Sequence, residues 1–363
     1  MILYKHERNY GCRILEVIFK GFKTLFLENE KIRVGILVEK GTDIFEFLYK
    51  PNDVDFMWRS YIGIKEKDFL PVIYNKNGNF LDLYHGGWQE LFPNAGDAVE
   101  YKGAYLPQHG EVHSIPWSYN VIKNEPEEII IKLFTRTNLT YFYIEKIITI
   151  KSMISALFIY ETIINESREE MDFMWGHHPA FGPPFLSEDC VIDMPKCKIL
   201  TDEVNLSPTT GRLAIGKRTD WPFTIGRNGQ KIDLSKIPSV DANSHDRAYI
   251  YDLEEGWYAL TNTKLRTGFG LAFDKNIFKY LWFWQVYGGA VGYPWYQKTY
   301  NIAIEPNSSY PPNLIDCINK RTSLKLLPGE SIKSAITAVA FDVSPKVDNQ
   351  RVKKVSLNGD ILF

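Results

Sequence analysis

The hydrophobic residues of this chain recur at every second position far more often than at helical spacing. Such alternation predicts β-strands with one buried face. Turns rich in Asn, Gly, Pro and Asp separate the alternating segments, and no convincing amphipathic helix exceeds three turns. A short helix is expected at 313–320. The clearest strands are expected at 31–40, 127–136, 143–152, 156–165, 268–275 and 331–341.

This pattern predicts an all-β protein built on a large antiparallel sheet. The aromatic content of 14% and the many β-branched residues agree with it, because both residue types favour strands. The chain has 363 residues and shows no internal repeat, low-complexity tract or linker-like shift in composition. A single domain over residues 1–363 is the simpler prediction.

The charge balance argues against two classes of partner. Lys and Arg total 42 against 44 for Asp and Glu, so neither nucleic acid nor an anionic membrane is expected as a partner. MILYKHERNY (1–10) carries charge where a signal peptide is apolar, and no segment has the roughly 18 apolar residues of a spanning helix. We therefore expect a cytoplasmic protein. Its four cysteines have neither metal-type pairing nor disulfide-rich density, and free thiols are expected at Cys12, Cys190, Cys197 and Cys317.

Four segments depart from the alternation and collect polar groups that are able to do chemistry. They are HGGWQELFPNAGD (85–97), LPQHGEVHSIPW (106–117), MWGHHPAFGPPF (174–185) and IAIEPNSSYPP (302–312). Each is dense in Gly, Pro and aromatics, as is typical of a loop or strand end beside a ligand. If these segments converge in space, the protein has a site.

The histidines do not have the spacing of a metal site. His109 and His113 would suit a helix, but nearby Pro and Gly residues disfavour one, and extended chain would separate the two by roughly 13 Å. His177 and His178 would point to opposite faces of a strand. No Cys pair or HExxH pattern supplies further ligands, so no metal is expected. Packing roles are expected for His177, His85 and His113.

His178 and Glu305 are the strongest candidates for acid–base chemistry. Each precedes a proline, which restricts the backbone to the extended region and so determines where the side chain points. Glu305 also closes an apolar strand, where desolvation raises a carboxyl pKa toward the range useful for a general base. An imidazole supplies the matching acid near neutral pH. The alternative for Glu305 alone is a surface carboxylate that ends a strand.

Five stretches, in this order, resemble the aldose 1-epimerase (galactose mutarotase-like) family. They are LENEKIRVGILVEKGTDIFEFLYKPNDVDFMW (27–58), HGEV (109–112), GHHPAFG (176–182), IEP (304–306) and SLKLLPGESIKSAITAVAF (323–341). The corresponding family marks are the first strands with a Gly turn, a His-Gly pair, a His with an aromatic two or three residues later, a late Glu-Pro, and closing strands around Leu-x-Pro-Gly-Glu. The likeness covers about residues 22–342.

The resemblance implies a β-supersandwich with a sugar cleft on one concave face. It also implies interconversion of the α and β anomers of an aldose, without cofactor or metal. Glu305 is then the base that takes the proton of the anomeric hydroxyl, and His178 is the acid that protonates the ring oxygen. His109 is the second active-site histidine. The three should converge on one cleft, and the protein should bind a small sugar as a monomer or homodimer.

Aromatic and amide side chains are the expected substrate contacts, because pyranoses stack on rings and their hydroxyls bind planar polar groups. The alternative for any of the aromatics is packing between two sheets. YLWFWQVYGGAVGYPWY (280–296) and the loop after residue 85 supply the candidates Trp88, Gln89, Glu90, Asn94, Trp284 and Gln285, with Trp295 beside them.

The sequence departs from the common family pattern in FPNAGDAVEYKG (92–103). Many members have a sugar-binding Arg there, and this chain has Asp97, so galactose or glucose is not assured as the substrate. A sugar-binding Asp before the final Glu could be Asp241, Asp246 or Asp274. A sugar phosphate stays open because of Arg247 and Arg266. The alternative functions are a non-catalytic carbohydrate-binding or regulatory protein, and another enzyme on this sandwich, such as a polysaccharide lyase or hydrolase accessory domain.

Overall fold

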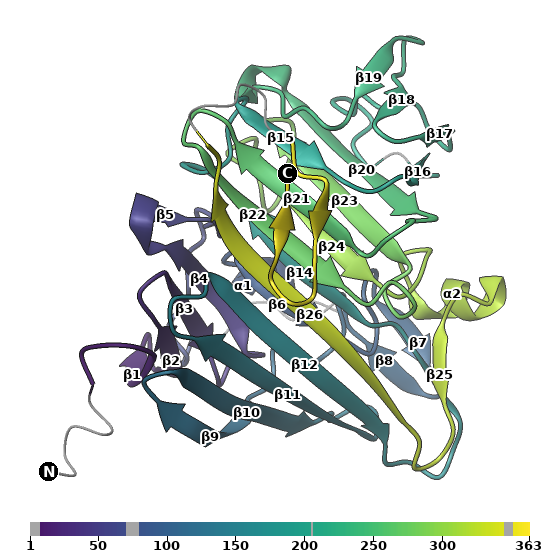
Figure 1. The fold of residues 1–363 in the computed structure, drawn as a ribbon. Coiled ribbons are helices and arrows are strands. Elements are labelled where there is room, and N and C mark those ends of the chain that lie inside the picture. The colour runs from purple at the N-terminus through teal and green to yellow at the C-terminus, as the bar shows by residue number, and fades with distance from the viewer. Residues whose placement is uncertain (1–7, 70–79, 205, 345–350) are drawn as a thin grey trace, which may run out of the picture.

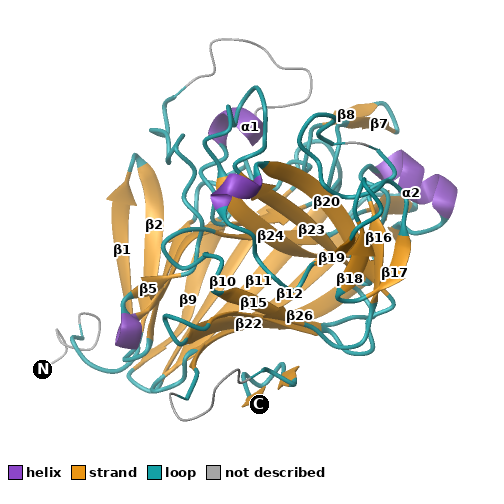
Figure 2. Ribbon diagram, turned by 90° about the horizontal axis from the view of Figure 1, so that it is seen from above, coloured by secondary structure: helices purple, strands orange, loops and turns teal. Residues whose placement is uncertain are grey.

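Two large antiparallel sheets stack face to face and enclose most of the apolar side chains (Figures 1 and 2). The computed structural model describes residues 8–69, 80–204, 206–344 and 351–363. Side chains that alternate in the sequence alternate in burial, as in β11 (Phe142–Lys151), where buried Phe142, Ile144, Ile148 and Ile150 face the second sheet. Burial of this inner face is the main source of stability.

The larger sheet has twelve strands in the order β1-β2-β3-β4-β6-β14-β24-β23-β20-β16-β17, with β5 paired to β4. Its strands are β1 (Arg13–Phe19), β2 (Phe22–Glu28), β3 (Ile32–Leu37), β4 (Asp43–Tyr49), β5 (Val54–Asp55), β6 (Trp88–Leu91), β14 (Gly176–Phe181), β16 (Lys198–Thr201), β17 (Arg218–Asp220), β20 (Ser244–Tyr251), β23 (Tyr280–Tyr287) and β24 (Tyr300–Asn307).

The smaller sheet has eight strands in the order β15-β21-β22-β26-β12-β11-β10-β9. Besides β11, its strands are β9 (Ser118–Glu125), β10 (Glu128–Arg136), β12 (Ala156–Asn165), β15 (Cys190–Asp193), β21 (Trp257–Asn262), β22 (Thr267–Phe273) and β26 (Ser331–Asp342). All six strands expected from the alternation are confirmed, within a few residues at their ends.

Short elements complete the fold. Four pairs form two-stranded sheets: β7 (Val99–Tyr101) with β8 (Ala104–Leu106), β13 (Met171–Phe173) with β25 (Leu324–Leu326), β18 (Phe223–Ile225) with β19 (Lys231–Asp233), and β27 (Lys354–Val355) with β28 (Ile361–Leu362). The described helices are α1 (Phe80–Leu83), α2 (Leu314–Lys320) and the 3₁₀ turns Lys50–Asn52 and Val240–Ala242.

The helix expected at 313–320 is α2. The Asn313 side chain caps it by accepting a hydrogen bond from the Asp316 amide at 2.9 Å, and Arg321 ends it in the left-handed conformation. No helix in the described ranges has the length and apolar character to cross a membrane.

The two faces of the sandwich are covered differently. The C-terminal hairpin β27–β28 packs on the outer face of the smaller sheet, where Val352 and Val355 join Trp257 and Phe341 in a separate apolar cluster (Figure 1). Across the molecule, α1 and the β7–β8 hairpin lie on the outer face of the larger sheet (Figure 2). The candidate site lies on this second face.

Candidate active site

The central strands β14 and β24 place His178 directly opposite Glu305. Gly176 pairs with Asn307 and Ala180 pairs with Ala303, so the antiparallel register puts His178 beside Glu305 between these pairs. The two side chains project from the same face of the sheet. His178 Nε2 lies 3.5 Å from Glu305 Oε1, and both residues are buried. This separation is slightly longer than a hydrogen bond and leaves the pair free to engage a ligand oxygen.

Tyr84 holds the other side of the His178 ring. Its hydroxyl lies 3.1 Å from His178 Nδ1 and is able to donate to this nitrogen or accept from it. His178 is therefore accommodated with its proton on either nitrogen. Burial lowers the pKa of the His178 imidazole to about 3, with His109 and His113 acting in the same direction. At neutral pH the free imidazole is uncharged.

Glu305 has the opposite perturbation. Burial raises the pKa of its carboxyl well above the usual value, although the positive charge of Arg247 acts against this. Its Oε2 atom is buried and has no hydrogen-bond partner in the part of the chain that the structure describes. A buried carboxyl oxygen without a hydrogen-bond partner in a cavity is typical of a group that binds a ligand.

His109 reaches the same cavity from a loop. The His109 ring is 5.5 Å from the His178 ring, centroid to centroid. Its Nδ1 donates to the Ala95 carbonyl at 2.7 Å, which leaves Nε2 as an acceptor. Gly110 follows with φ +74°, and a Cβ there would lie 2.2 Å from the Phe92 carbonyl oxygen. The His-Gly pair thus needs glycine for the close approach of two loops.

Aromatic rings form the walls of a cavity of about 200 Å³ around these groups. Trp284 packs against Trp295 at 5.6 Å and against the His178 ring at 6.0 Å, centroid to centroid. The Trp284 indole N–H donates to His245 Nε2 at 2.9 Å, and His245 Nδ1 lies 2.7 Å from Ser207 Oγ. Both His245 nitrogens are therefore engaged, and we assign His245 to holding the Trp284 ring rather than to moving protons.

Charged side chains line one end of the cavity. Arg247 extends from β20 and is held by Asp202, whose Oδ2 accepts from Arg247 Nε at 2.8 Å and lies 2.7 Å from Nη2. Asp97 lies on the opposite loop and also lines the cavity. Burial raises the pKa of the Asp97 carboxyl, and Arg247 lowers it. These groups are suited to the hydroxyls of a polar ligand.

The structure brings together His109, His178, Glu305, Trp284 and Trp295, but it places two other expected contacts elsewhere. Trp88 and Glu90 pair with Pro179 and His177 on β14 and therefore face the interior between the sheets. The Trp88 indole donates to His177 Nδ1 at 3.2 Å, and Glu90 accepts from the Trp175 indole at 3.1 Å. Their expected role as sugar contacts is corrected to one in the core.

Three amide side chains that were expected to contact the sugar also lie away from the cavity. Gln89 faces the same side as His178, but its Nε2 donates to the Gly86 carbonyl at 2.7 Å and does not reach the cavity. Asn94 Oδ1 accepts from the Leu314 amide at 3.1 Å, and its Nδ2 donates to carbonyls of its own loop. Gln285 follows Trp284 and so points to the opposite face, where it accepts from Arg212 at 2.7 Å.

None of the three candidate aspartates is among the described residues that line the cavity. Asp246 accepts from the Arg212 and Leu213 amides at 2.9 Å each. Asp274 caps a turn by accepting from the Asn276 amide at 2.9 Å, and Asp241 lies in a 3₁₀ turn at the surface. Sequence reasoning missed Tyr84 and His245, and it considered Arg247 only as a phosphate contact. The alternation of His245 and Arg247 along β20 was the available signal.

His177 belongs to a buried charged cluster behind the site. Glu90, Glu161 and His177 place potential ligand atoms within 4.8 Å of one another, which a metal ion could use. Lys146 Nζ instead contacts Glu90 at 2.8 Å and Glu161 at 3.4 Å, and His177 Nε2 lies 3.0 Å from Glu161. The ammonium group is thus the cation of this cluster. Burial opposes this charge, but the two carboxylates outweigh it and raise the Lys146 pKa.

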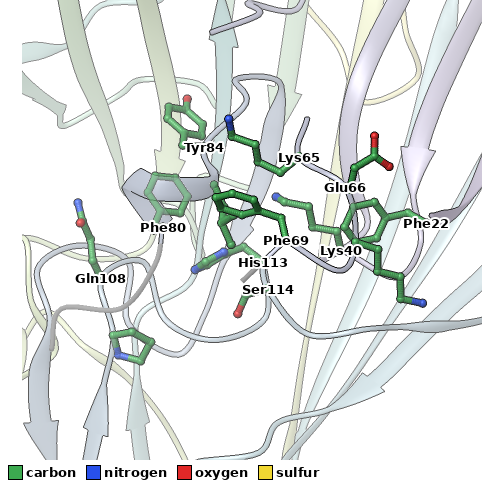
Figure 3. A pocket seen from close by; sticks show the side chains of 13 residues that line it. Phe22, Lys40, Lys65, Glu66, Phe69, Phe80, Tyr84, Gln108, His113 and Ser114 are labelled. Atoms are coloured by element: carbon green, nitrogen blue, oxygen red, sulfur yellow. The ribbon is translucent and has the colours of Figure 1, made fainter. Parts of the chain in front are cut away.

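His113 lines a second, larger cavity of about 410 Å³ (Figure 3). This second cavity shares Phe80, Tyr84 and Gln108 with the first one, and lysines and phenylalanines line its far side. The rings of His109 and His113 lie 4.3 and 5.0 Å from the Phe80 ring. Backbone hydrogen bonds from Gly110 to Pro107 and from Ser114 to Glu111 form turns in this loop, so the extended chain assumed for the 13 Å separation is wrong. The described residues that line this cavity do not include the carboxylate–imidazole pair of the smaller one.

The two antiparallel sheets have a galactose mutarotase-like fold. The chain belongs to the DUF4432 family, a domain of unknown function whose model matches residues 19–213. No curated protein matches the chain.

Solved structures with the same fold cover nearly the whole chain. An inferred aldose 1-epimerase from Klebsiella pneumoniae has a TM-score of 0.70 at 16% identity, over 91% of this chain and 83% of its own. A galactose mutarotase-like protein from Clostridium acetobutylicum has a TM-score of 0.64 at 16% identity, over 92% and 99%. A galactose mutarotase related enzyme from Lactobacillus acidophilus has a TM-score of 0.58 at 18% identity, over 89% and 98%. At these identities the likeness establishes the fold.

Proposed function

We propose that this protein is an aldose 1-epimerase, which interconverts the α and β anomers of a sugar by opening and closing its ring. The observation that carries the proposal is the buried pair of Glu305 and His178, which are opposed at 3.5 Å in an aromatic-walled cavity. Mutarotation requires one proton to leave the anomeric hydroxyl and one to reach the ring oxygen. An acid and a base held against one sugar ring meet this requirement.

The pair is suited to hold a single exchangeable proton. Burial favours the neutral forms of both groups, and transfer of the proton from Glu305 to His178 produces the reactive ion pair. Glu305 then removes the proton of the anomeric hydroxyl, the carbonyl forms, and the bond from the anomeric carbon to the ring oxygen breaks. His178 protonates the ring oxygen. Rotation of the aldehyde and the reverse steps give the other anomer, with no net change in protons.

The remaining cavity residues position the sugar. Trp284 and Trp295 offer rings on which the apolar face of a pyranose stacks. His109 Nε2 accepts a hydrogen bond from a sugar hydroxyl, because its Nδ1 is already engaged with the Ala95 carbonyl. Arg247 and Asp97 bind hydroxyls at the other end of the cavity. The proposed substrate therefore needs one monosaccharide ring with a free anomeric hydroxyl.

The first test of the proposal is turnover. Wild-type protein is mixed with freshly dissolved pure α anomers of glucose, galactose, xylose, arabinose and mannose, and of sugar phosphates, and approach to anomeric equilibrium is followed by proton NMR or polarimetry. We expect acceleration over the spontaneous rate for at least one sugar. Binding without acceleration across the whole panel would contradict the epimerase and favour a carbohydrate-binding protein.

The pH dependence follows from the two perturbed groups. The active form carries one proton on the pair, so activity falls on the acid side only when His178 is also protonated, near its pKa of about 3. On the alkaline side it falls as Glu305 loses its proton, above the usual carboxyl range. We therefore expect kcat/KM at pH 5 to be no lower than at pH 7, with circular dichroism recorded to verify folding. A tenfold loss between pH 7 and 5 would contradict these assignments.

A further inference from the structure

The second cavity, of about 410 Å³, has the features of a ligand site separate from the catalytic one (Figure 3). It is larger than the catalytic cavity of about 200 Å³, and neither Glu305 nor His178 is among the described residues that line it. Its wall combines the buried His113, a group of lysines and several apolar side chains. Each of these three parts restricts the chemistry of the ligand.

His113 contributes a buried hydrogen-bond acceptor to this wall. The residue is only 6% exposed, and its Nε2 atom has no hydrogen-bond partner in the part of the chain that the structure describes. Burial lowers the pKa of the His113 imidazole to about 3, so the ring is uncharged at neutral pH. The Gln108 and Gly110 carbonyls accept hydrogen bonds from the ring and act in the opposite direction. The single ring proton is therefore on Nδ1, and Nε2 is left to accept from a ligand O–H or N–H.

One lysine of the wall provides a positive charge that no described carboxylate compensates. The other three charged side chains of the wall are paired: Lys40 contacts Asp43 at 2.5 Å, Lys67 contacts Glu39 at 2.9 Å and Glu66 contacts Lys20 at 2.8 Å. Lys65 is half-buried, and its ammonium group has no ion-pair partner among the described residues. A single free ammonium group suits one carboxylate better than a doubly charged phosphate.

The apolar part of the wall suits an aromatic ring. Its members are Phe22, Phe69, Phe80, Leu83 and Pro107. The Lys65 ammonium group lies 5.5 Å from the centroid of the Phe69 ring, and the His113 ring lies 5.0 Å from that of Phe80. Both polar groups thus border aromatic surface. An aryl ring packed on this surface is able to direct one substituent to the ammonium group and another to the imidazole.

We propose that the second cavity binds a small hydroxyaryl carboxylate, with its ring on the phenylalanines, its carboxylate at Lys65 and its hydroxyl donating to His113 Nε2. A neutral sugar would leave the Lys65 charge without a partner. The site goes beyond the proposed epimerase function and does not depend on it, because it uses neither Glu305 nor His178. Tyr84 lines both cavities and contacts His178 at 3.1 Å, so the two sites are adjacent.

The test measures binding by ligand-observed NMR or titration calorimetry with three probes. They are para-hydroxyphenylacetate, phenylacetate, which lacks the hydroxyl, and para-hydroxyphenylacetamide, which lacks the charge. We expect para-hydroxyphenylacetate to bind wild type about two- to tenfold more tightly than either of the others, the worth of one hydrogen bond or one partly exposed ion pair. His113→Leu should remove the advantage of the hydroxyl, and Lys65→Met that of the carboxylate over the amide. Lys151→Met, which alters a lysine that is 51% exposed, is the matched control.

Equal affinity of wild type for the three probes, or no binding of any of them, would overturn the inference. Loss of binding in Glu305→Gln or His178→Asn would also overturn it, because the probe would then occupy the catalytic cavity. Circular dichroism verifies that each variant is folded. If His113→Leu does not fold, Lys65→Met decides the question, and an unchanged preference for the carboxylate over the amide in that variant would reject the site. Turnover of a sugar plays no part in these measurements, so failure of the epimerase leaves their outcome unaffected.

Discussion

Glutamine in place of Glu305 is expected to lower the catalysed mutarotation rate by about 10²–10⁴-fold, the usual contribution of a positioned acid or base. Glutamine preserves the shape of the side chain but cannot accept the proton of the anomeric hydroxyl. His178→Asn should cause a loss of similar size, because the ring oxygen then lacks its proton donor. The rate is measured by NMR on the best substrate of the sugar panel. Residual activity above one tenth of wild type in Glu305→Gln would exclude this residue as the base.

Thermal unfolding distinguishes loss of chemistry from loss of fold in the same variant. The pKa of Glu305 is raised in the folded protein, so its carboxyl favours folding below the unfolded pKa and opposes it as the pH rises above that value. At pH 7 the buried carboxyl therefore lowers the stability of the wild type, and glutamine removes this cost because it does not ionise. Glu305→Gln should be inactive yet melt at a higher temperature than wild type at pH 7. The difference in Tm between the two proteins should shrink toward pH 4. A lower Tm would show that the inactivity has a structural cause.

Methionine in place of Lys146 is expected to lower the free energy of unfolding by about 3–5 kcal/mol, because a buried ion cluster that loses one partner retains uncompensated charge. Glu90 and Glu161 contact the ammonium group at 2.8 and 3.4 Å, and the side chain is only 6% exposed. Urea denaturation at pH 7 measures the change. Lys151→Met on the same strand, where the side chain is 51% exposed, should change the free energy little.

A second substitution tests the cause of this effect. Combining Lys146→Met with Glu161→Gln should recover part of the lost stability, since one of the stranded carboxylates becomes neutral. If the double variant is less stable than Lys146→Met alone, the loss came from packing around the lysine stem, whose Nζ lies 5.3 Å from the Trp117 ring centroid.

Local sequence was sufficient to predict the strands, and it singled out two residues, His178 and Glu305, that the structure places side by side. Alternation predicted β12 and β26 to within a residue, because one buried face imposes a period of two on any strand of a sandwich. His178 and Glu305 were singled out because each precedes a proline, and Glu305 also closes an apolar strand. The family resemblance added His109, which follows no local rule, since it lies on a loop with φ +63°.

The residues that line the cavity were less predictable, because the face to which a side chain points depends on how the strands pair. Adjacent residues on a strand point to opposite faces, so Trp284 lines the cavity while Gln285 contacts Arg212 behind it. The same rule separates His178 from His177. Composition alone could not say which member of each pair faces the cavity. Tyr84 gave no signal in the sequence beyond its residue type, and the only signal for His245 was its alternation with Arg247.

The amino-acid sequence by itself determined the all-β class and the positions of the main strands, and it singled out His178 and Glu305 as candidates, since these predictions depend on periodicity and on neighbours in the chain. Only the tertiary structure decided which polar residues share the cavity and which neutralise Lys146 in the core. The reason is physical: β14 and β24 lie more than a hundred residues apart in the chain, and their register, set by the burial of both sheets, brings His178 and Glu305 within 3.5 Å.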